Sequence, residues 1–91
     1  MKKLDDTVQE QIILFGKRVR QLRKMAVYTQ GEFAKECNIP REQIGRIERG
    51  EINTSIGNLF TISKVLGIHP TKMLDFSNLD IDRKNILDGR I

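Results

Sequence analysis

Residues 30–49 read QGEFAKECNIPREQIGRIER, a pattern that indicates two short helices joined by a tight turn. Ala34 is small where the second helix must approach the first. Asn38 suits the turn because asparagine tolerates the positive-φ conformation that a sharp exit from a helix requires. Three isoleucines are expected to be buried beneath the crossing: Ile39, Ile44 and Ile47. The outward face of the second helix then carries only polar or small residues: Arg41, Glu42, Gln43, Gly45, Arg46 and Arg49.

A longer helix is expected before this segment, from a capping box at Thr7 and Glu10 to about Met25. Its apolar residues recur at steps of three and four, which places them on one stripe that faces the core: Val8, Ile12, Phe15, Val19 and Leu22. Its basic residues are expected to face away from the core: Lys17, Arg18, Arg20 and Lys24.

Start and stop signals place the remaining helices. Thr29 and Glu32 form a second capping box, Pro40 has a φ suited to the first turn of the next helix, and Gly50 ends that helix. Ser55 is the expected N-cap of a fourth helix that Gly67 closes, with a predicted buried set of Ile56, Leu59, Phe60, Ile62 and Leu66. Pro70 favours a short fifth helix containing Met73 and Leu74, beside which His69 has a capping or surface role. The predicted fold is all-α.

Length and composition limit the classes of function. Ninety-one residues make one compact domain, too small for a large enzyme cleft, and no nucleophile, base and orienting group recur at a spacing that would gather them. We therefore expect a non-enzyme without a cofactor. The chain has one cysteine, Cys37, and one histidine, His69, which excludes an internal disulfide and a cysteine-based zinc site. We expect Cys37 to be a small buried residue that fills space in the core. No apolar run reaches the roughly 20 residues of a membrane span, so a cytoplasmic protein is expected.

The positive charge is concentrated where the two short helices lie. The net charge is +4, and residues 12–50 carry nine Lys or Arg against four Glu. Such a field attracts a polyanion. The outward residues of the second helix match the edges of DNA bases, since Arg bonds guanine, Gln prefers adenine and Glu accepts from cytosine. Arg41, Gln43 and Arg46 are the expected base contacts, although Arg46 could serve phosphate alone. Glu42 could read cytosine, repel wrong sequences, or pair with Arg46.

Phosphate contacts need donors that ignore sequence, and helix N-termini supply free amides with a positive dipole. Two such ends are expected to meet the DNA backbone, one at Thr29 and Gln30 and the other at Ser55, Gly57 and Asn58. Lys17, Lys24 and Arg49 are further candidates. The alternative for Lys17, Arg18 and Lys24 is a solvated helix face without specific contacts.

Residues 15–76 resemble the lambda-repressor-like, Cro/C1-type regulators. The resemblance rests on GKRVRQLR at 16–23, TQGEFA at 29–34, IGRIERG at 44–50 and LGI at 66–68, in the order and spacing of that family. It implies a five-helix bundle, a phosphate contact by Gln30, base contacts by the outward residues from Arg41 to Arg46, and a structural ion pair between Arg23 and Glu48.

The sequence departs from the family pattern at four positions. Pro40 replaces the usual Ser or Thr cap, and Val27 replaces the glycine that commonly ends the first helix, so that junction is expected to differ. Gly31 and Gly45 lie inside helices and should each cost up to roughly 1 kcal/mol against alanine.

These patterns predict a transcriptional regulator, in first place a repressor, that binds double-stranded DNA as a homodimer with half-sites about one helical turn apart. Residues 1–76 would form the DNA-binding domain. Residues 77–91 would be a C-terminal extension for dimerisation or a protein partner, because the end of the chain offers apolar side chains at Leu79, Ile81, Ile86, Leu87 and Ile91. A protein-binding antitoxin with secondary DNA binding is the alternative, and a degenerate domain kept for assembly is a third. The sequence does not separate phage regulators, restriction-modification controllers and antitoxins.

Overall fold

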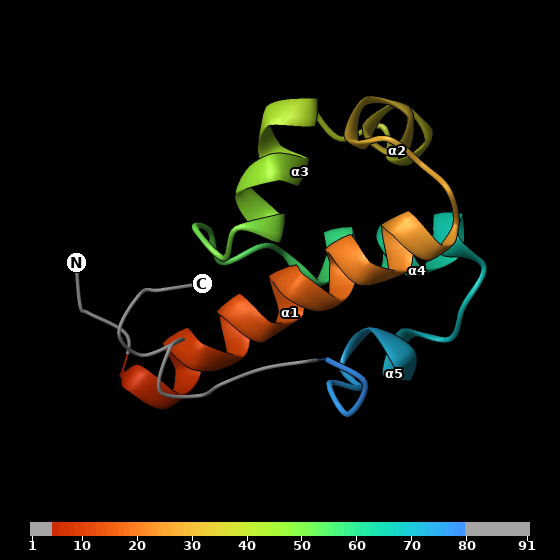
Figure 1. Ribbon diagram of the computed structural model, residues 1–91. Helices are drawn as coiled ribbons and strands as arrows, with labels where there is room; N and C mark the ends of the chain where they lie inside the picture. The colour runs from red at the N-terminus through yellow and green to blue at the C-terminus, as the bar shows by residue number, and fades with distance from the viewer. Residues whose placement is uncertain (1–4, 80–91) are drawn as a thin grey trace.

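The computed structural model describes residues 5–79, and within that range it consists of five helices and no strand (Figure 1). The helices are α1 (Asp6–Met25), α2 (Gln30–Cys37), α3 (Arg41–Glu48), α4 (Ile56–Leu66) and α5 (Pro70–Met73). α1 runs across the molecule, with α2 and α3 on one side of it and α5 on the other. The predicted all-α, five-helix fold is confirmed. None of the helices in residues 5–79 combines the length and the apolar character that a bilayer crossing requires.

Most of the predicted helix ends are present. At α2 the Thr29 hydroxyl accepts from the Glu32 amide at 3.1 Å, and the Glu32 carboxylate accepts from the Thr29 amide at 2.9 Å. Asn38 closes α2 in the left-handed conformation, as predicted, with φ 55°. Gly50 and Gly67 follow α3 and α4 with φ 69° and 70°. These residues end the helices because they adopt positive φ at low cost.

Two other predicted caps are formed at α4 and α5. The Ser55 hydroxyl accepts from the Asn58 amide at 3.0 Å. His69 precedes α5, and its imidazole accepts from the Thr71 amide in the first turn of that helix. α3 begins at Arg41, and Pro40 is its N-cap without a capping side chain, as expected from the replacement of the usual Ser or Thr.

The predicted capping box at Thr7 is wrong. α1 begins at Asp6, and Asp5 is its N-cap, with its carboxylate accepting from the Val8 amide at 3.0 Å. A carboxylate at this position satisfies an orphan amide and also interacts favourably with the helix dipole. Glu10 is buried, and Val8, predicted to face the core, is 38 % exposed.

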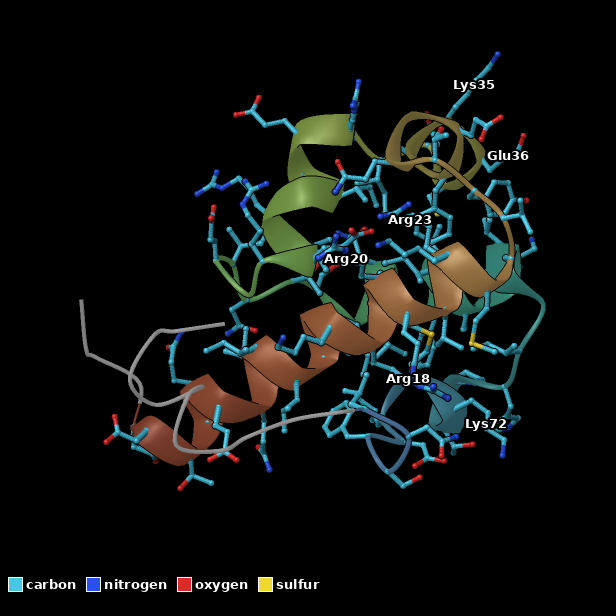
Figure 2. The ribbon with its side chains drawn as sticks, in the orientation of Figure 1. Arg18, Arg20, Arg23, Lys35, Glu36 and Lys72 are labelled. Carbon is cyan, nitrogen blue, oxygen red and sulfur yellow. The ribbon has the colours of Figure 1, made fainter. Side chains whose placement is uncertain are left out.

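The prediction that Arg18 faces away from the core is also wrong. Arg18 is only 6 % exposed, and Figure 2 shows it pointing from α1 towards α5. Its Nε donates to the Lys72 carbonyl at 2.8 Å and its Nη1 to the Gln21 side chain at 2.7 Å. A buried guanidinium is tolerated only where its donors find acceptors. The contact with the Lys72 carbonyl ties α1 to α5, and the contact with Gln21 lies within α1.

The buried face of α4 is narrower than predicted. Ile62 is fully buried, but Ile56 is 70 % and Phe60 52 % exposed. Ser63 is buried, and its hydroxyl donates to the Phe60 carbonyl at 2.9 Å, which allows a polar residue inside the bundle. Leu74 lies just after α5 and is 55 % exposed. α4 packs on α2 and α5 through the Ile62 face and leaves large apolar side chains in solvent.

The core joins all five helices, with Ile62 of α4 and Met73 of α5 fully buried in it. Its fully buried side chains include Val19, Phe33, Ile44 and Ile47, and Cys37 fills a small space beside them, as predicted. α1 and α3 approach each other closely at Gly16, where a Cβ atom would collide with the Ile47 carbonyl oxygen and lie 2.8 Å from that of Glu48. The missing side chain of Gly16 therefore sets the distance between these two helices.

Candidate nucleic-acid interface

α3 presents a polar ridge because its other face is held in the core. Ile44 and Ile47 are buried to 1 % exposure or less, whereas Arg41, Glu42 and Arg46 are exposed and Gln43 is half-buried. The helix turns 100° per residue, so residues 42 and 46 project opposite the buried isoleucines, and residues 41 and 43 lie on the two flanks of that face. The structure thus brings together the four residues that the sequence assigned to base contacts.

Gly45 does not lie on the open surface as expected. It is buried, and a Cβ atom at this position would be 3.1 Å from Nη1 of Arg49 and 3.7 Å from the Gln30 side chain. Arg49 therefore lies back across α3 next to Gln30. The lack of a side chain at Gly45 makes room for both.

The ion pair that the resemblance implies is formed. Arg23 Nε and Glu48 Oε2 lie 2.6 Å apart and Arg23 Nη2 and Glu48 Oε1 3.0 Å apart, with both side chains buried. Arg23 also donates to the Tyr28 carbonyl at 2.8 Å. Gln30 joins the pair by donating to Glu48 Oε1 at 3.1 Å. The two-pronged geometry fixes α1 against α3 and holds Gln30 at the start of α2.

A hollow of about 360 Å³ lies beside this network, lined by Arg20, Arg23, Gln30, Glu48 and Arg49. Figure 2 shows Arg20 and Arg23 extending from α1 on the side of α3. Arg20 was not among the predicted site residues. Its spacing of three from Arg23 places both on one face of α1, which is the sequence signal that could have found it.

Glu51, directly after α3, is a second residue that the sequence reasoning missed. Its carboxylate accepts from Arg49 Nε at 2.7 Å and Nη2 at 3.3 Å and lies 3.9 Å from Arg46 Nε. The hydrogen bonds from Arg49 lower the pKa of Glu51, so this carboxylate stays charged at neutral pH. Two exposed arginines of the α3 face thus share one anionic partner.

The predicted phosphate residues fall into separate groups. Gln30 and Arg49 lie together at the hollow, with Thr29 at the start of α2. Ser55, Gly57 and Asn58 do not line the hollow, and Asn58 is engaged within the chain, since its amide donates to Ser55 and its side chain donates to Thr54 at 3.0 Å. Lys24 is exposed and Lys17 half-buried on α1.

Comparison with known proteins shows which family the chain belongs to. Residues 19–73 match the helix-turn-helix family model, a span that runs from the second half of α1 to the end of α5. The chain belongs to this family of DNA-binding regulators. Proteins of this kind place the second helix of the helix-turn-helix motif in the major groove. In this chain the second helix of the motif is α3.

Two curated relatives support the assignment. The helix-turn-helix chain is 43 % identical over 68 residues to the control protein C.BamHI of Bacillus amyloliquefaciens, an alignment that covers 74 % of this chain and 84 % of the relative. It is 37 % identical over 62 residues to the HTH-type transcriptional regulator DicA of Escherichia coli K12, covering 68 % of this chain but only 46 % of DicA.

Two solved structures resemble the fold. The restriction-modification controller protein C.AhdI from Aeromonas hydrophila superposes with a TM-score of 0.67 at 31 % identity, over 68 % of this chain and 94 % of C.AhdI. A hypothetical transcription factor, NHTF, from Neisseria gives a TM-score of 0.70 over 82 % of this chain and 85 % of its own, and at 23 % identity it supports the fold alone.

Proposed function

We propose that this protein regulates transcription by inserting α3 into the major groove of a specific double-stranded DNA site. The observation that supports the proposal is the ridge of Arg41, Glu42, Gln43 and Arg46, backed by two fully buried isoleucines. Arg41 and Arg46 would donate to guanine, Gln43 would pair with adenine, and Glu42 would accept from cytosine. Because the ridge is held by the core, little ordering is needed on binding.

Contacts with the DNA backbone would fix the position of this ridge. We assign them first to the Gln30 side chain, to the first two amides of α2, which have no acceptor within the helix, and to Arg49. Arg20 joins this set because it lines the same hollow. Six further residues remain proposed phosphate contacts on the basis of the sequence: Lys17, Lys24, Thr29, Ser55, Gly57 and Asn58.

The relatives narrow the kind of regulation. C.BamHI is named a control protein and C.AhdI a restriction-modification controller protein, and we propose that this chain likewise controls genes of a restriction-modification system, with repression as one of its actions. The role is one of binding rather than catalysis, exercised in the cytoplasm. We propose that the DNA-binding domain ends at residue 76 and that residues 77–91 form a C-terminal extension. Residues 80–91 of this extension lie outside the part of the chain that the structure describes.

We further propose that the protein acts as a homodimer through the exposed apolar face of α4. Ile56 and Phe60 belong to it, and Ile56 also lines a groove of about 290 Å³. The other apolar residues of that groove include Val8, Phe15, Leu59 and Leu74, and its polar residues are uncharged: Gln11, Asn53, Thr54 and Ser55. The twelve residues 52–63 contain no charged side chain, in a chain that is 31 % charged. A two-fold interface places the same surface patch of both copies face to face, so an uncharged face meets itself without repulsion.

Selection of bound duplexes from a random DNA pool tests DNA recognition. The wild-type chain should enrich one sequence with two-fold symmetry, and a variant carrying both Arg41→Ala and Arg46→Ala should lose the enrichment. A variant carrying Lys64→Ala and Lys72→Ala is the matched control, because it removes the same charge from exposed residues outside α3. Failure of the wild-type chain to bind any duplex at low salt would refute the proposal.

Sedimentation at micromolar concentration tests the dimer. Phe60→Ser should shift the chain towards monomer, whereas Met25→Ser, which changes an apolar side chain of 71 % exposure at the end of α1, should leave the dimer intact. If the dimer survives Phe60→Ser, its interface lies elsewhere, and the C-terminal extension is the next segment to test. A monomeric wild-type chain would remove the dimer from the proposal.

A further inference from the structure

We infer that Glu51 is an internal competitor for DNA, whose carboxylate occupies Arg49 in the free protein and thereby lowers its affinity for every duplex. This inference rests on the proposed function. Glu51 lies in the loop after α3 and would set how tightly the interface binds.

The contact geometry is that of an arginine bound to an oxyanion. Glu51 accepts from two nitrogens of Arg49, at 2.7 and 3.3 Å, and its second interaction is with Arg46 at 3.9 Å. A DNA phosphate would use the same two guanidinium donors, because arginine binds carboxylate and phosphate with the same fork. Nε has a single hydrogen, so while it donates to Glu51 this edge of Arg49 cannot bind a phosphate in the same two-pronged way.

The position of Arg49 explains why the competition affects binding. Arg49 lies over Gly45 and beside Gln30, on the hollow where we place backbone contacts. All three side chains of the Arg46, Arg49 and Glu51 cluster are about half exposed, so the cluster contributes little to the fold and is accessible to DNA. Binding therefore requires Arg49 to exchange one anion for another, and the Glu51 charge is then left close to the phosphates.

The expected effect is moderate and independent of sequence. Exposed ion pairs are weak, so removal of the Glu51 charge should raise DNA affinity by about two- to fivefold. The gain should be similar for the cognate duplex and for an unrelated one, because the residue released contacts backbone rather than bases.

Fluorescence anisotropy with Glu51→Gln tests the inference. This variant keeps the side-chain size and removes the charge, and Glu36→Gln is the control for net charge alone, because Glu36 is exposed on α2 and points away from α3. We expect tighter binding of both duplexes by Glu51→Gln than by Glu36→Gln, with unchanged melting temperatures. Equal gains from the two variants, or weaker binding by Glu51→Gln, would overturn the inference.

A double-mutant cycle identifies the residue through which Glu51 acts. In an Arg49→Gln background the gain from Glu51→Gln should largely disappear, because no arginine remains to be released at that position. A full gain without Arg49 would show that Glu51 acts only through its long-range charge. If the wild-type chain binds neither duplex, the proposed function itself fails; if it binds and the cycle shows no coupling, only the role of Glu51 fails.

Discussion

At Val27 the chain keeps a left-handed turn after α1 without the glycine that such turns favour. Its φ is 63°, and its side chain is 86 % exposed, so no packing compensates for the strain. The turn is held by backbone bonds from Val27 to Lys24 and from Tyr28 to Arg23. Val27→Gly should raise the free energy of unfolding by about 1–2 kcal/mol, as measured with urea. Val27→Ala, which still has a Cβ atom, should gain less; equal stability of all three proteins would contradict the argument.

Cys37 gives the protein a pH dependence in the alkaline range. Burial raises the pKa of its thiol to about 11, from 9.0. An acid whose folded pKa is raised supports the fold below the unfolded pKa, and that contribution is lost as pH rises from 9 towards 11. Between pH 8 and 10 the wild-type chain should lose roughly 1 kcal/mol more stability than Cys37→Ala. Parallel urea titrations of the two proteins check this, and identical pH dependence would exclude the thiol as the cause.

At the scale of elements, the packing of α1 on α3 depends on Gly16. Gly16→Ala would improve helix propensity by up to roughly 1 kcal/mol, yet the new Cβ would press on two backbone carbonyls that cannot move without separating the helices, at a cost of about 1–3 kcal/mol or more. We expect a net loss of stability in thermal unfolding. Gly31→Ala is the control within α2, since its nearest neighbour would be Arg41 Cδ at 4.0 Å, and it should be stabilising. A stable Gly16→Ala variant would show that α1 can shift freely.

Element ends were more predictable from sequence than element faces. Thr29, Asn38 and Gly67 were assigned correctly because caps depend on local backbone geometry, which neighbouring residues determine. Arg18 and Phe60 were misplaced because their burial depends on where another helix lies. A carbonyl at Lys72, 54 residues away, makes the burial of Arg18 possible, and no periodicity in α1 reveals it.

At the scale of the whole molecule, the sequence predicts which residues form the α3 ridge. It does not predict which residues of neighbouring segments contact and position them. The ridge follows from helical spacing alone, since Ile44 and Ile47 define the buried side. Arg20 and Glu51 were missed because they enter the interface from α1 and from the loop after α3. Their contribution depends on the tertiary arrangement, in which the Arg23–Glu48 pair brings α1 against α3.

This arrangement predicts a division of labour in DNA binding between two helices. Arg46 is exposed on α3, so Arg46→Ala should reduce discrimination at one base pair by about 1–3 kcal/mol. Lys17 lies on α1 outside the ridge, so Lys17→Ala should weaken all duplexes alike and reduce the dependence of log K on log salt by about one phosphate contact. Binding constants for the cognate duplex and its single-base variants, measured at several salt concentrations, separate these effects. If both substitutions changed base preference, or neither did, α3 would not be the element that reads sequence.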